Sequence, residues 1–417
     1  MRAQLTWTLV TELLVMAAGI FVLKLAAQLL GSVGFGEYTV SRRAVGLMYL
    51  PLVLGLGIAA PRYIAIARAG ALPGYNPKSF AIATLIAGLA PAAIVILLMN
   101  LNPTGASRVL FGSSSMQPLI QPSAIALSGL TLHSMVYAIF RGRGDMHFAN
   151  VLSFVDNGIV PVAAFLFVSH NAATVLATTG TAWLVISAIA LVVALTTESI
   201  IETTETVSSH AKMLLKFGMP RVPGEFALVG LFALPALIAL RTQGVVSAGH
   251  LSAGMSLTSL VAGVFGPVGL VMLPRASAQA AQGDLIGLRK IVLKMLGAGL
   301  AIAIAVVVVG EVLIPPFVKW YFGAAFLPAI PVFRTCLLGA IPYVVYVLLR
   351  NILDALDVKA VNSRNLIITL AFLLILCFIK PDIMSMSISL LASLTLLGIL
   401  SLWETQVRLG RRAVASP

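Results

Sequence analysis

The chain has 417 residues, of which 59% are hydrophobic and 10% are charged. A typical soluble domain carries about 25% charged residues, so this composition excludes an ordinary globular surface. The net charge of +13 would suggest nucleic-acid binding in a soluble protein, but the charges here lie between apolar runs and are better explained by membrane topology. The sequence is therefore that of a polytopic membrane protein that lies in the lipid bilayer and binds no nucleic acid.

Twelve apolar runs follow one another along the chain, most of them long enough to cross a membrane as a helix of about 20 residues. In the first half they cover residues 7–30, 42–66, 80–99, 118–140, 149–169 and 174–196. In the second half they cover residues 217–240, 247–273, 291–314, 328–350, 364–379 and 383–403. We predict an all-α protein with a six-helix bundle at 1–196, a cytoplasmic linker at 197–216, a second six-helix bundle at 217–403 and a cytoplasmic tail at 404–417.

The basic residues orient these spans. With the N-terminus in the cytoplasm, the inner segments hold 18 Lys and Arg residues and the outer segments hold 6. Basic residues are enriched in the cytoplasmic loops of membrane proteins. Both termini are therefore predicted to be cytoplasmic, in a multi-pass protein of the inner membrane.

The two halves of the chain repeat several features in the same order. At an offset of 213 positions, Glu12 matches Glu225 and the pair Pro61-Arg62 matches Pro274-Arg275. Since six spans is an even number, both halves begin on the same side of the membrane. This predicts two bundles related by a pseudo-twofold axis along the membrane normal, with a binding cleft where the repeats meet.

Lys24 lies inside the first apolar run, with apolar neighbours on both sides. An ionisable residue costs about 2.5–3.5 kcal/mol to insert at the centre of a membrane, which makes it a candidate for function. Lys24 is about 9 Å along the helix from the outer end of its span. It can therefore either snorkel to the interface or bind an anionic ligand, and the sequence leaves both roles open.

Further arginines lie at the outer ends of predicted spans, against the prevailing charge bias. Each alone fits an interfacial anchor, but together they can hold an anionic headgroup, because the guanidinium fork matches phosphate and carboxylate oxygens. These residues are Arg42, Arg43, Arg241 and Arg334. Arg221 and Glu225 are four residues apart on one helical face, where they can form an ion pair or line a cavity.

Charged residues also recur at the inner ends of matching spans in both halves. Arg62 and Arg275 each follow a proline, and an Arg-x-x-x-Asp pattern occurs at Arg141–Asp145 and at Arg350–Asp354. Repetition in both halves favours a symmetric role in fixing helix ends or gating the inner mouth. Contact with substrate is the second interpretation of these residues.

Sequence signatures of catalysis are missing. The chain has no P-loop, dinucleotide fingerprint, His–Glu metal motif or nucleophile elbow. We therefore expect no catalytic residue, no metal and no cofactor. Energy for any transport must then come from an ion gradient, the membrane potential or the gradient of the cargo.

Several short segments resemble a known transporter family. They are Gly36-Glu37-Tyr38, Gly55 to Arg62, Tyr137 to Asp145, Leu349 to Ala355, and Asn362-Ser363-Arg364-Asn365-Leu366. With them, the chain resembles the multidrug/oligosaccharidyl-lipid/polysaccharide (MOP) exporter superfamily, and within it the polysaccharide transporter branch of Wzx-type oligosaccharide and O-antigen flippases. The resemblance covers most of the chain through motifs that are each short.

The resemblance implies a two-lobed fold of 12 to 14 helices that moves a polyprenyl-pyrophosphate-linked oligosaccharide across the membrane by alternating access. Such a flippase serves lipopolysaccharide, capsule or exopolysaccharide synthesis, beside glycan polymerases or glycosyltransferases as partners. Family cavities are usually cationic, which implies this role for Lys24, Arg221 and Arg334, with the arginines at 42, 43 and 241 at the mouth. Many relatives carry an Asp-Arg pair in the seventh span, where this chain has Leu240-Arg241, so Glu12 and Glu225 remain as candidates for ion coupling.

Two other classes of function compete with the flippase. A proton- or sodium-coupled exporter of small cationic molecules, the MATE-like alternative, should have an acidic cavity, whereas bases outnumber acids in and beside the spans of this chain. A membrane enzyme of glycan assembly usually needs large loops outside the membrane, and the longest outer connection here is modest, near residues 100–117. The glycan carried, the coupling ion and the oligomeric state are left open by the sequence.

Overall fold

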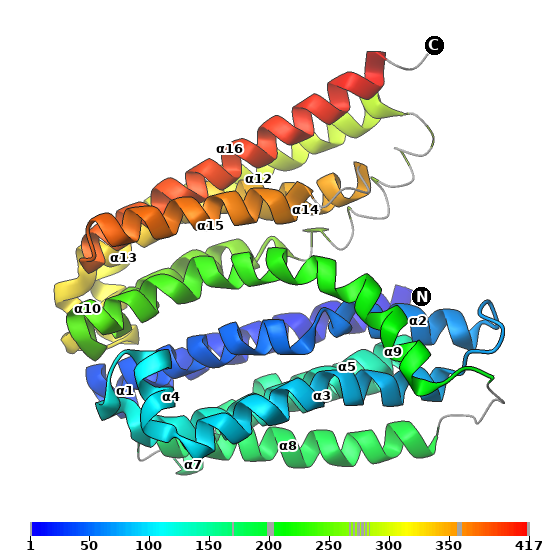
Figure 1. Cartoon of the computed structure of the whole chain (residues 1–417). Helices are drawn as coiled ribbons and strands as arrows, with labels where there is room; N and C mark the ends of the chain where they lie inside the picture. The colour runs from blue at the N-terminus through cyan, green and yellow to red at the C-terminus, as the bar shows by residue number, and fades with distance from the viewer. Residues whose placement is uncertain are drawn as a thin grey trace. The chain divides into compact units, whose positions relative to one another are not determined.

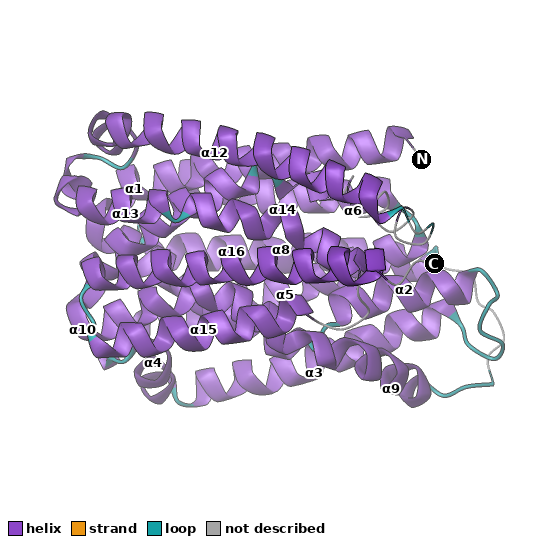
Figure 2. Cartoon of the chain, turned by 90° about the horizontal axis from the view of Figure 1, so that it is seen from above, coloured by secondary structure: helices purple, strands orange, loops and turns teal. Residues whose placement is uncertain are grey.

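A computed structural model describes the chain except for residues 1, 169–170, 198–203, 267, 270–271, 273–275, 277–278, 280–281, 283, 357–360 and 415–417. The regular structure in the described part is helical throughout, as Figure 2 shows. The all-α fold predicted from the apolar runs is confirmed.

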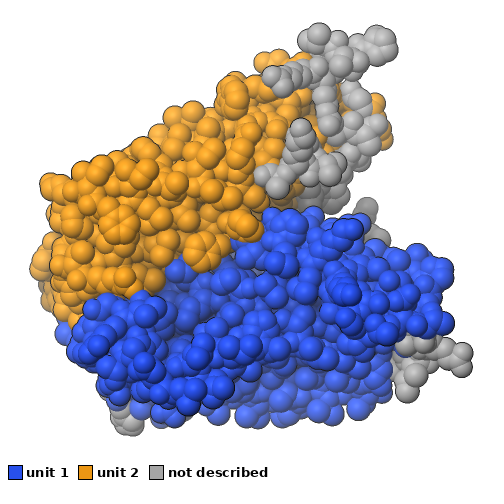
Figure 3. Space-filling model, viewed as in Figure 1, with its two compact units in different colours: residues 1–222 blue, residues 223–417 orange. Residues whose placement is uncertain are grey.

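The chain divides into two compact units, Met1–Val222 and Pro223–Pro417, which Figure 3 colours separately. Unit 1 contains α1 (Arg2–Val53), α2 (Leu56–Arg68), α3 (Pro77–Leu101), α4 (Pro103–Phe111), η1 (Ser114–Leu119), α5 (Ile120–Arg143), α6 (Met146–Phe154), η2 (Val155–Ile159), α7 (Val160–Val168), α8 (Ala172–Thr196), α9 (Val207–Gly218) and η3 (Met219–Arg221). Unit 2 follows α10 (Val222–Gly263) with α12 (Leu285–Tyr321), η4 (Ala324–Ala329), α13 (Ile330–Leu338), α14 (Ala340–Leu356), α15 (Val361–Ile379) and α16 (Ile383–Val414).

Two of the longest helices are broken by a glycine at equivalent positions. In α1 the break is at Gly31 (φ 66°, ψ −174°), and in α10 it is at Gly244 (φ 85°, ψ 178°). This backbone conformation is essentially restricted to glycine, because a Cβ atom would clash with the neighbouring peptide groups. The two glycines are separated by the same 213 residues that relate Glu12 to Glu225.

Ten segments of the described chain are long and apolar enough to cross a membrane. Two of them, Thr6–Val53 and Val207–Gly263, contain the glycine breaks and are long enough for two spans each. Counting each broken segment as two gives the twelve spans predicted from the sequence. The chain is thus a multi-pass membrane protein with about twelve helices in two bundles.

The second span begins earlier than predicted. The helix resumes directly after Gly31 and continues to Val53, whereas the sequence analysis places residues 31–41 in a loop. Thr39 of this stretch does not require a loop, because its Oγ1 donates to the carbonyl oxygen of Phe35 at 2.8 Å within the same helix. Arg42 and Arg43 are therefore about 16 Å along the helix from the break at Gly31, at 1.5 Å per residue.

Close packing of α5 against α8 positions the interior of unit 1. A Cβ atom on Gly180 of α8 would lie 2.6 Å from the backbone of Ala126 in α5. The absence of side chains there lets the two helix backbones approach closely, as small residues commonly do in membrane proteins. One or two turns further along these helices, His133 of α5 and Trp183 of α8 both contact Asp156.

Candidate functional site

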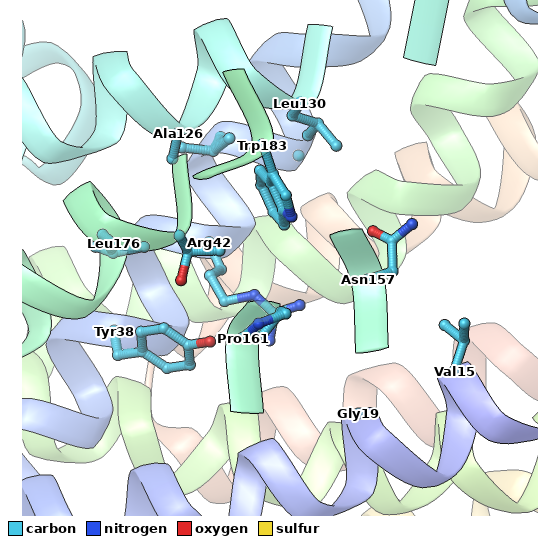
Figure 4. A pocket seen from close by; sticks show the side chains of 13 residues that line it. Val15, Gly19, Tyr38, Arg42, Ala126, Leu130, Asn157, Pro161, Leu176 and Trp183 are labelled. Atoms are coloured by element: carbon cyan, nitrogen blue, oxygen red, sulfur yellow. The ribbon is translucent and has the colours of Figure 1, made fainter. Parts of the chain in front are cut away.

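Unit 1 contains a cavity of about 380 Å³ inside its helical bundle. Both arms of α1 line it together with α5, α7, α8 and the π-helical turn η2. Its apolar wall includes Val15, Val45 and Leu130. Its polar groups come from Tyr38, Arg42, Asn157 and Trp183, which Figure 4 labels, and from Thr179.

Arg42 makes this cavity cationic. Among the described residues that line it, Arg42 carries the only full charge, and the lining includes no carboxylate. The guanidinium carbon lies 5.4 Å from the centre of the Tyr38 ring, within the range of a cation–π contact. Thr179 adds a buried hydroxyl oxygen without a hydrogen-bond partner in the described chain. A cation, an amide, hydroxyls and two aromatic rings together suit an anionic ligand rich in hydroxyl groups.

A buried ionisable pair lies behind the cavity wall. His133 Nδ1 of α5 lies 2.7 Å from Asp156 Oδ2 of η2, and Asp156 is fully buried. Ser187 of α8 donates to the same carboxylate oxygen at 3.1 Å, and the Trp183 indole N–H donates to the Asp156 carbonyl oxygen at 2.5 Å. Asp156 sits in a π-helical turn, a local geometry frequent at functional sites.

The hydrogen bonds indicate which imidazole nitrogen of His133 carries the hydrogen. Asn157 Nδ2 donates to His133 Nε2 at 3.2 Å, which leaves Nδ1–H to donate to Asp156 and makes the imidazole neutral. If Asn157 instead presents its amide oxygen, Nε2 can carry a second proton. Asp156 Oδ1 has no partner among the described atoms. Asn157, which also lines the cavity, connects this pair to it.

The other predicted cations of unit 1 lie outside the cavity lining. Lys24 is half-buried in the first arm of α1 and Arg43 is half-buried beside Arg42, while neither lines the cavity. Glu12, a predicted coupling residue, is exposed. Arg42 is thus the one predicted ligand residue that the structure brings to this site.

Three of the predicted site residues, Glu225, Arg241 and Arg334, lie in unit 2. Arg241 is exposed, three residues before the break at Gly244, and Glu225 is half-buried in the first turn of α10. Arg334 of α13 pairs with Glu311 of α12, with Nε and Oε2 3.5 Å apart.

Arg221 does not make the ion pair with Glu225 that their spacing predicts. Its guanidinium carbon lies 3.9 Å from the centre of the Phe217 ring, and Nη1 donates to the Phe217 carbonyl oxygen at 2.5 Å. The guanidinium of Arg62 lies over the same ring, with its carbon 4.8 Å from the ring centre.

The repeated Arg-x-x-x-Asp segments have similar but not identical contacts. Arg141 and Arg350 each lie over the tyrosine four residues earlier, at 5.6 Å from Tyr137 and 6.0 Å from Tyr346. Asp145 pairs with Arg143 at 2.9 Å, while Asp354 accepts from Asn362 at 2.7 Å. These contacts join neighbouring helix ends. Arg275 lies outside the described residues.

The sequence analysis missed the buried cluster, although one signal was present. Asp156 and Asn157 fall inside the predicted span 149–169, and His133 falls inside 118–140. Ionisable residues inside a membrane span usually mark functional sites. That rule alone selects Asp156 and His133, whereas their pairing across different helices requires the structure.

The described part of the chain is a polytopic helical protein with a cationic cavity in unit 1. The fold is that of solved MATE transporters of the MOP superfamily. An inward-facing multidrug resistance MATE transporter matches with a TM-score of 0.77 at 15% identity, over 98% of this chain and 96% of that one. An outward-facing one matches with 0.68 at 12% identity, over 99% and 97% of the two chains.

A third solved structure adds a comparison of pocket chemistry. It is a MOP superfamily transporter from Pyrococcus furiosus, described as having a binding pocket of reverse polarity that suggests a different function. It matches with a TM-score of 0.68 at 13% identity, over 98% of this chain and 96% of that one. No protein-family model and no curated protein matches the sequence.

Proposed function

We propose that the protein moves a polyprenyl-pyrophosphate-linked oligosaccharide across the inner membrane by alternating access, with both termini in the cytoplasm. In this role it serves the assembly of lipopolysaccharide, capsule or exopolysaccharide. The observation that supports the proposal most is the cavity of unit 1, where Arg42 is the charged group and carboxylates are missing from the described lining.

The cavity groups match the parts of such a cargo. The Arg42 guanidinium offers a planar fork for pyrophosphate oxygens. Asn157 and Thr179 can exchange hydrogen bonds with sugar hydroxyls, and the rings of Tyr38 and Trp183 offer flat apolar faces to sugar rings. The lipid tail needs no polar site, because the hydrocarbon of the bilayer already solvates it.

The competing function is export of small cations, as a MATE-like proton- or sodium-coupled carrier. A cationic drug placed beside Arg42 would meet a like charge in a low-dielectric cavity, where repulsion is stronger than in water. Asp156 could attract such a cargo only after leaving His133 and Ser187, which hold its carboxylate. The chemistry of the cavity therefore favours the anionic cargo.

We further propose that the His133–Asp156 pair, rather than Glu12 or Glu225, exchanges the proton that couples transport to the membrane gradient. Asp156 is fully buried and has one carboxylate oxygen without a hydrogen-bond partner among the described residues. Adding a proton there changes the hydrogen bonds of His133, and through it those of Asn157 in the cavity wall. Glu12 is exposed on its helix, where protonation would rearrange fewer contacts.

The test is transport by the purified protein in liposomes that carry a fluorescent polyprenyl-pyrophosphate oligosaccharide. Arg42→Ala should lower the rate at least tenfold, and Arg42→Lys should restore part of it, because lysine keeps the charge but loses the fork. Arg108→Ala removes an exposed arginine of unit 1 outside the cavity and should leave the rate unchanged. Equal rates for Arg42→Ala and the unmodified protein would refute the proposal.

A further inference from the structure

Helix α9 lies on the surface of unit 1 as an amphipathic helix. Its buried side holds His210, Leu214 and Gly218, while Lys212 and Lys216 are exposed one turn apart. It packs against α2 and α3, and Figure 1 shows it beside α2 at one end of the unit. Because its apolar side packs on the protein, the two lysines lie on the side that faces away from it.

The helix is fixed to unit 1 at both ends. At its start, His210 Nε2 accepts from the backbone N–H of Asn76 at 3.2 Å, and His210 Nδ1 lies 2.7 Å from the Thr206 carbonyl oxygen. At its end, Gly218 packs so closely on Gly55 that a Cβ atom on either glycine would overlap the backbone of α9 or of the α1–α2 connection. Lys212 and Lys216 are therefore presented from a rigid base.

Two arginines extend this basic surface. Arg62 of α2 and Arg221 of η3 both rest on the Phe217 ring, at 4.8 Å and 3.9 Å from its centre. The two guanidinium carbons are thus no further apart than the sum of these distances, which is less than a Debye length of about 10 Å in 0.1 M salt. We name Arg62, Lys212, Lys216 and Arg221 the α9 basic patch.

The α9 basic patch has no neutralising partner in the described chain. None of its four residues forms an ion pair with a described carboxylate. The described carboxylate nearest in sequence to Lys212 is Glu205, two residues before α9 begins. Positive charges held this close repel one another, so an anion bound among them is stabilised.

The patch is separate from the cavity. It shares no residue with the cavity lining, and Arg62 lies on α2, beyond the break at Leu54 and Gly55 that follows the helix carrying Arg42. This separation favours an anion of the membrane surface over the cargo held in the cavity.

We propose that the α9 basic patch binds the phosphate of an anionic glycerophospholipid at the surface of the inner leaflet. The proposed orientation places α9 on the cytoplasmic side, where anionic lipids attract basic residues next to the membrane. The lipid holds α9, and with it this end of unit 1, against the bilayer. The binding does not depend on which cargo the cavity takes.

The probe is phosphatidylglycerol, titrated into the delipidated full-length protein and followed by native mass spectrometry, with phosphatidylcholine as the zwitterionic reference. Each basic residue near an anionic surface contributes about fivefold in affinity, so Arg62→Gln with Arg221→Gln should weaken phosphatidylglycerol binding about 25-fold. The matched pair Arg108→Gln and Lys319→Gln removes two exposed charges elsewhere and should bind as the unmodified protein does. If the arginine variant fails to fold, Lys212→Gln with Lys216→Gln tests the same patch at exposed positions.

Four results would overturn the proposal. Equal binding of the two phospholipids would show that charge has no role, and unchanged binding by both patch variants would place the lipid elsewhere. Displacement of phosphatidylglycerol by an equal amount of polyprenyl pyrophosphate would assign the patch to the cargo. Displacement by inorganic phosphate at the same concentration would make it a soluble-anion site.

Discussion

The buried carboxylate of Asp156 allows the sharpest prediction, because two substitutions there separate folding from coupling. Asp156→Asn keeps an oxygen that accepts from His133 and Ser187 but removes the charge. Hydrogen bonds to charged groups contribute about 1.5–3 kcal/mol and those between neutral groups about 0.5–1.5 kcal/mol. Two such bonds are weakened, so the free energy of unfolding should fall by about 2 kcal/mol.

Asp156→Ala should cost more, because it leaves His133 and Ser187 buried without their acceptor. Each buried polar group left without its partner costs about 1–3 kcal/mol. Thermal melting in detergent measures the order of the two variants. Asp145→Asn is the matched control, since Asp145 pairs with Arg143 at a partly exposed helix end and should change stability by less than about 1 kcal/mol.

Transport in liposomes with and without an imposed pH gradient gives the functional half of the test. Asp156→Asn should fold and still bind cargo, yet lose the acceleration by the gradient. Asp145→Asn should keep it. A folded Asp156→Asn protein that still responds fully to the gradient would refute the coupling role of the His133–Asp156 pair.

Three further substitutions test the packing described above by their melting temperatures. Gly180→Leu should destabilise unit 1 by at least about 1–3 kcal/mol, because its Cβ alone meets the backbone of Ala126 at 2.6 Å; an unchanged melting temperature would show that α5 and α8 are further apart. Gly244→Ala should cost about 1–3 kcal/mol through backbone strain alone, since nothing lies within 4 Å of the added methyl group. Glu311→Gln should cost less than about 1 kcal/mol, because the side chain of its partner Arg334 is 49% exposed; a large loss would mean that this pair supports more than one local contact.

Hydrophobicity was sufficient to predict the number of helices, because each span must bury an apolar run of fixed length. It was insufficient at the start of the second span. Polar residues such as Thr39 indicated a loop, whereas in the structure Thr39 bonds back to its own helix. A single glycine at position 31 makes the turn that a longer polar loop was expected to make.

The candidate site was predicted only in part. Arg42 was named as a ligand for an anionic group, and the structure moves it from a predicted outer mouth into a cavity. An ion pair between Arg221 and Glu225 was one expectation, because four-residue spacing on a helix favours it. In the structure the Arg221 guanidinium instead lies over the ring of Phe217, four residues earlier in the chain. The pairing of His133 with Asp156 spans 23 residues and two helices, so no local pattern could reveal it.

The central claim is that the cavity around Arg42 selects a phosphorylated, sugar-bearing lipid over an organic cation. The most direct measurement compares both cargoes in the same liposomes: a fluorescent polyprenyl-pyrophosphate oligosaccharide and a fluorescent quaternary ammonium compound. Our account predicts movement of the lipid, loss of that movement in Arg42→Ala, and no transport of the cation. Transport of the cation without movement of the lipid would contradict it.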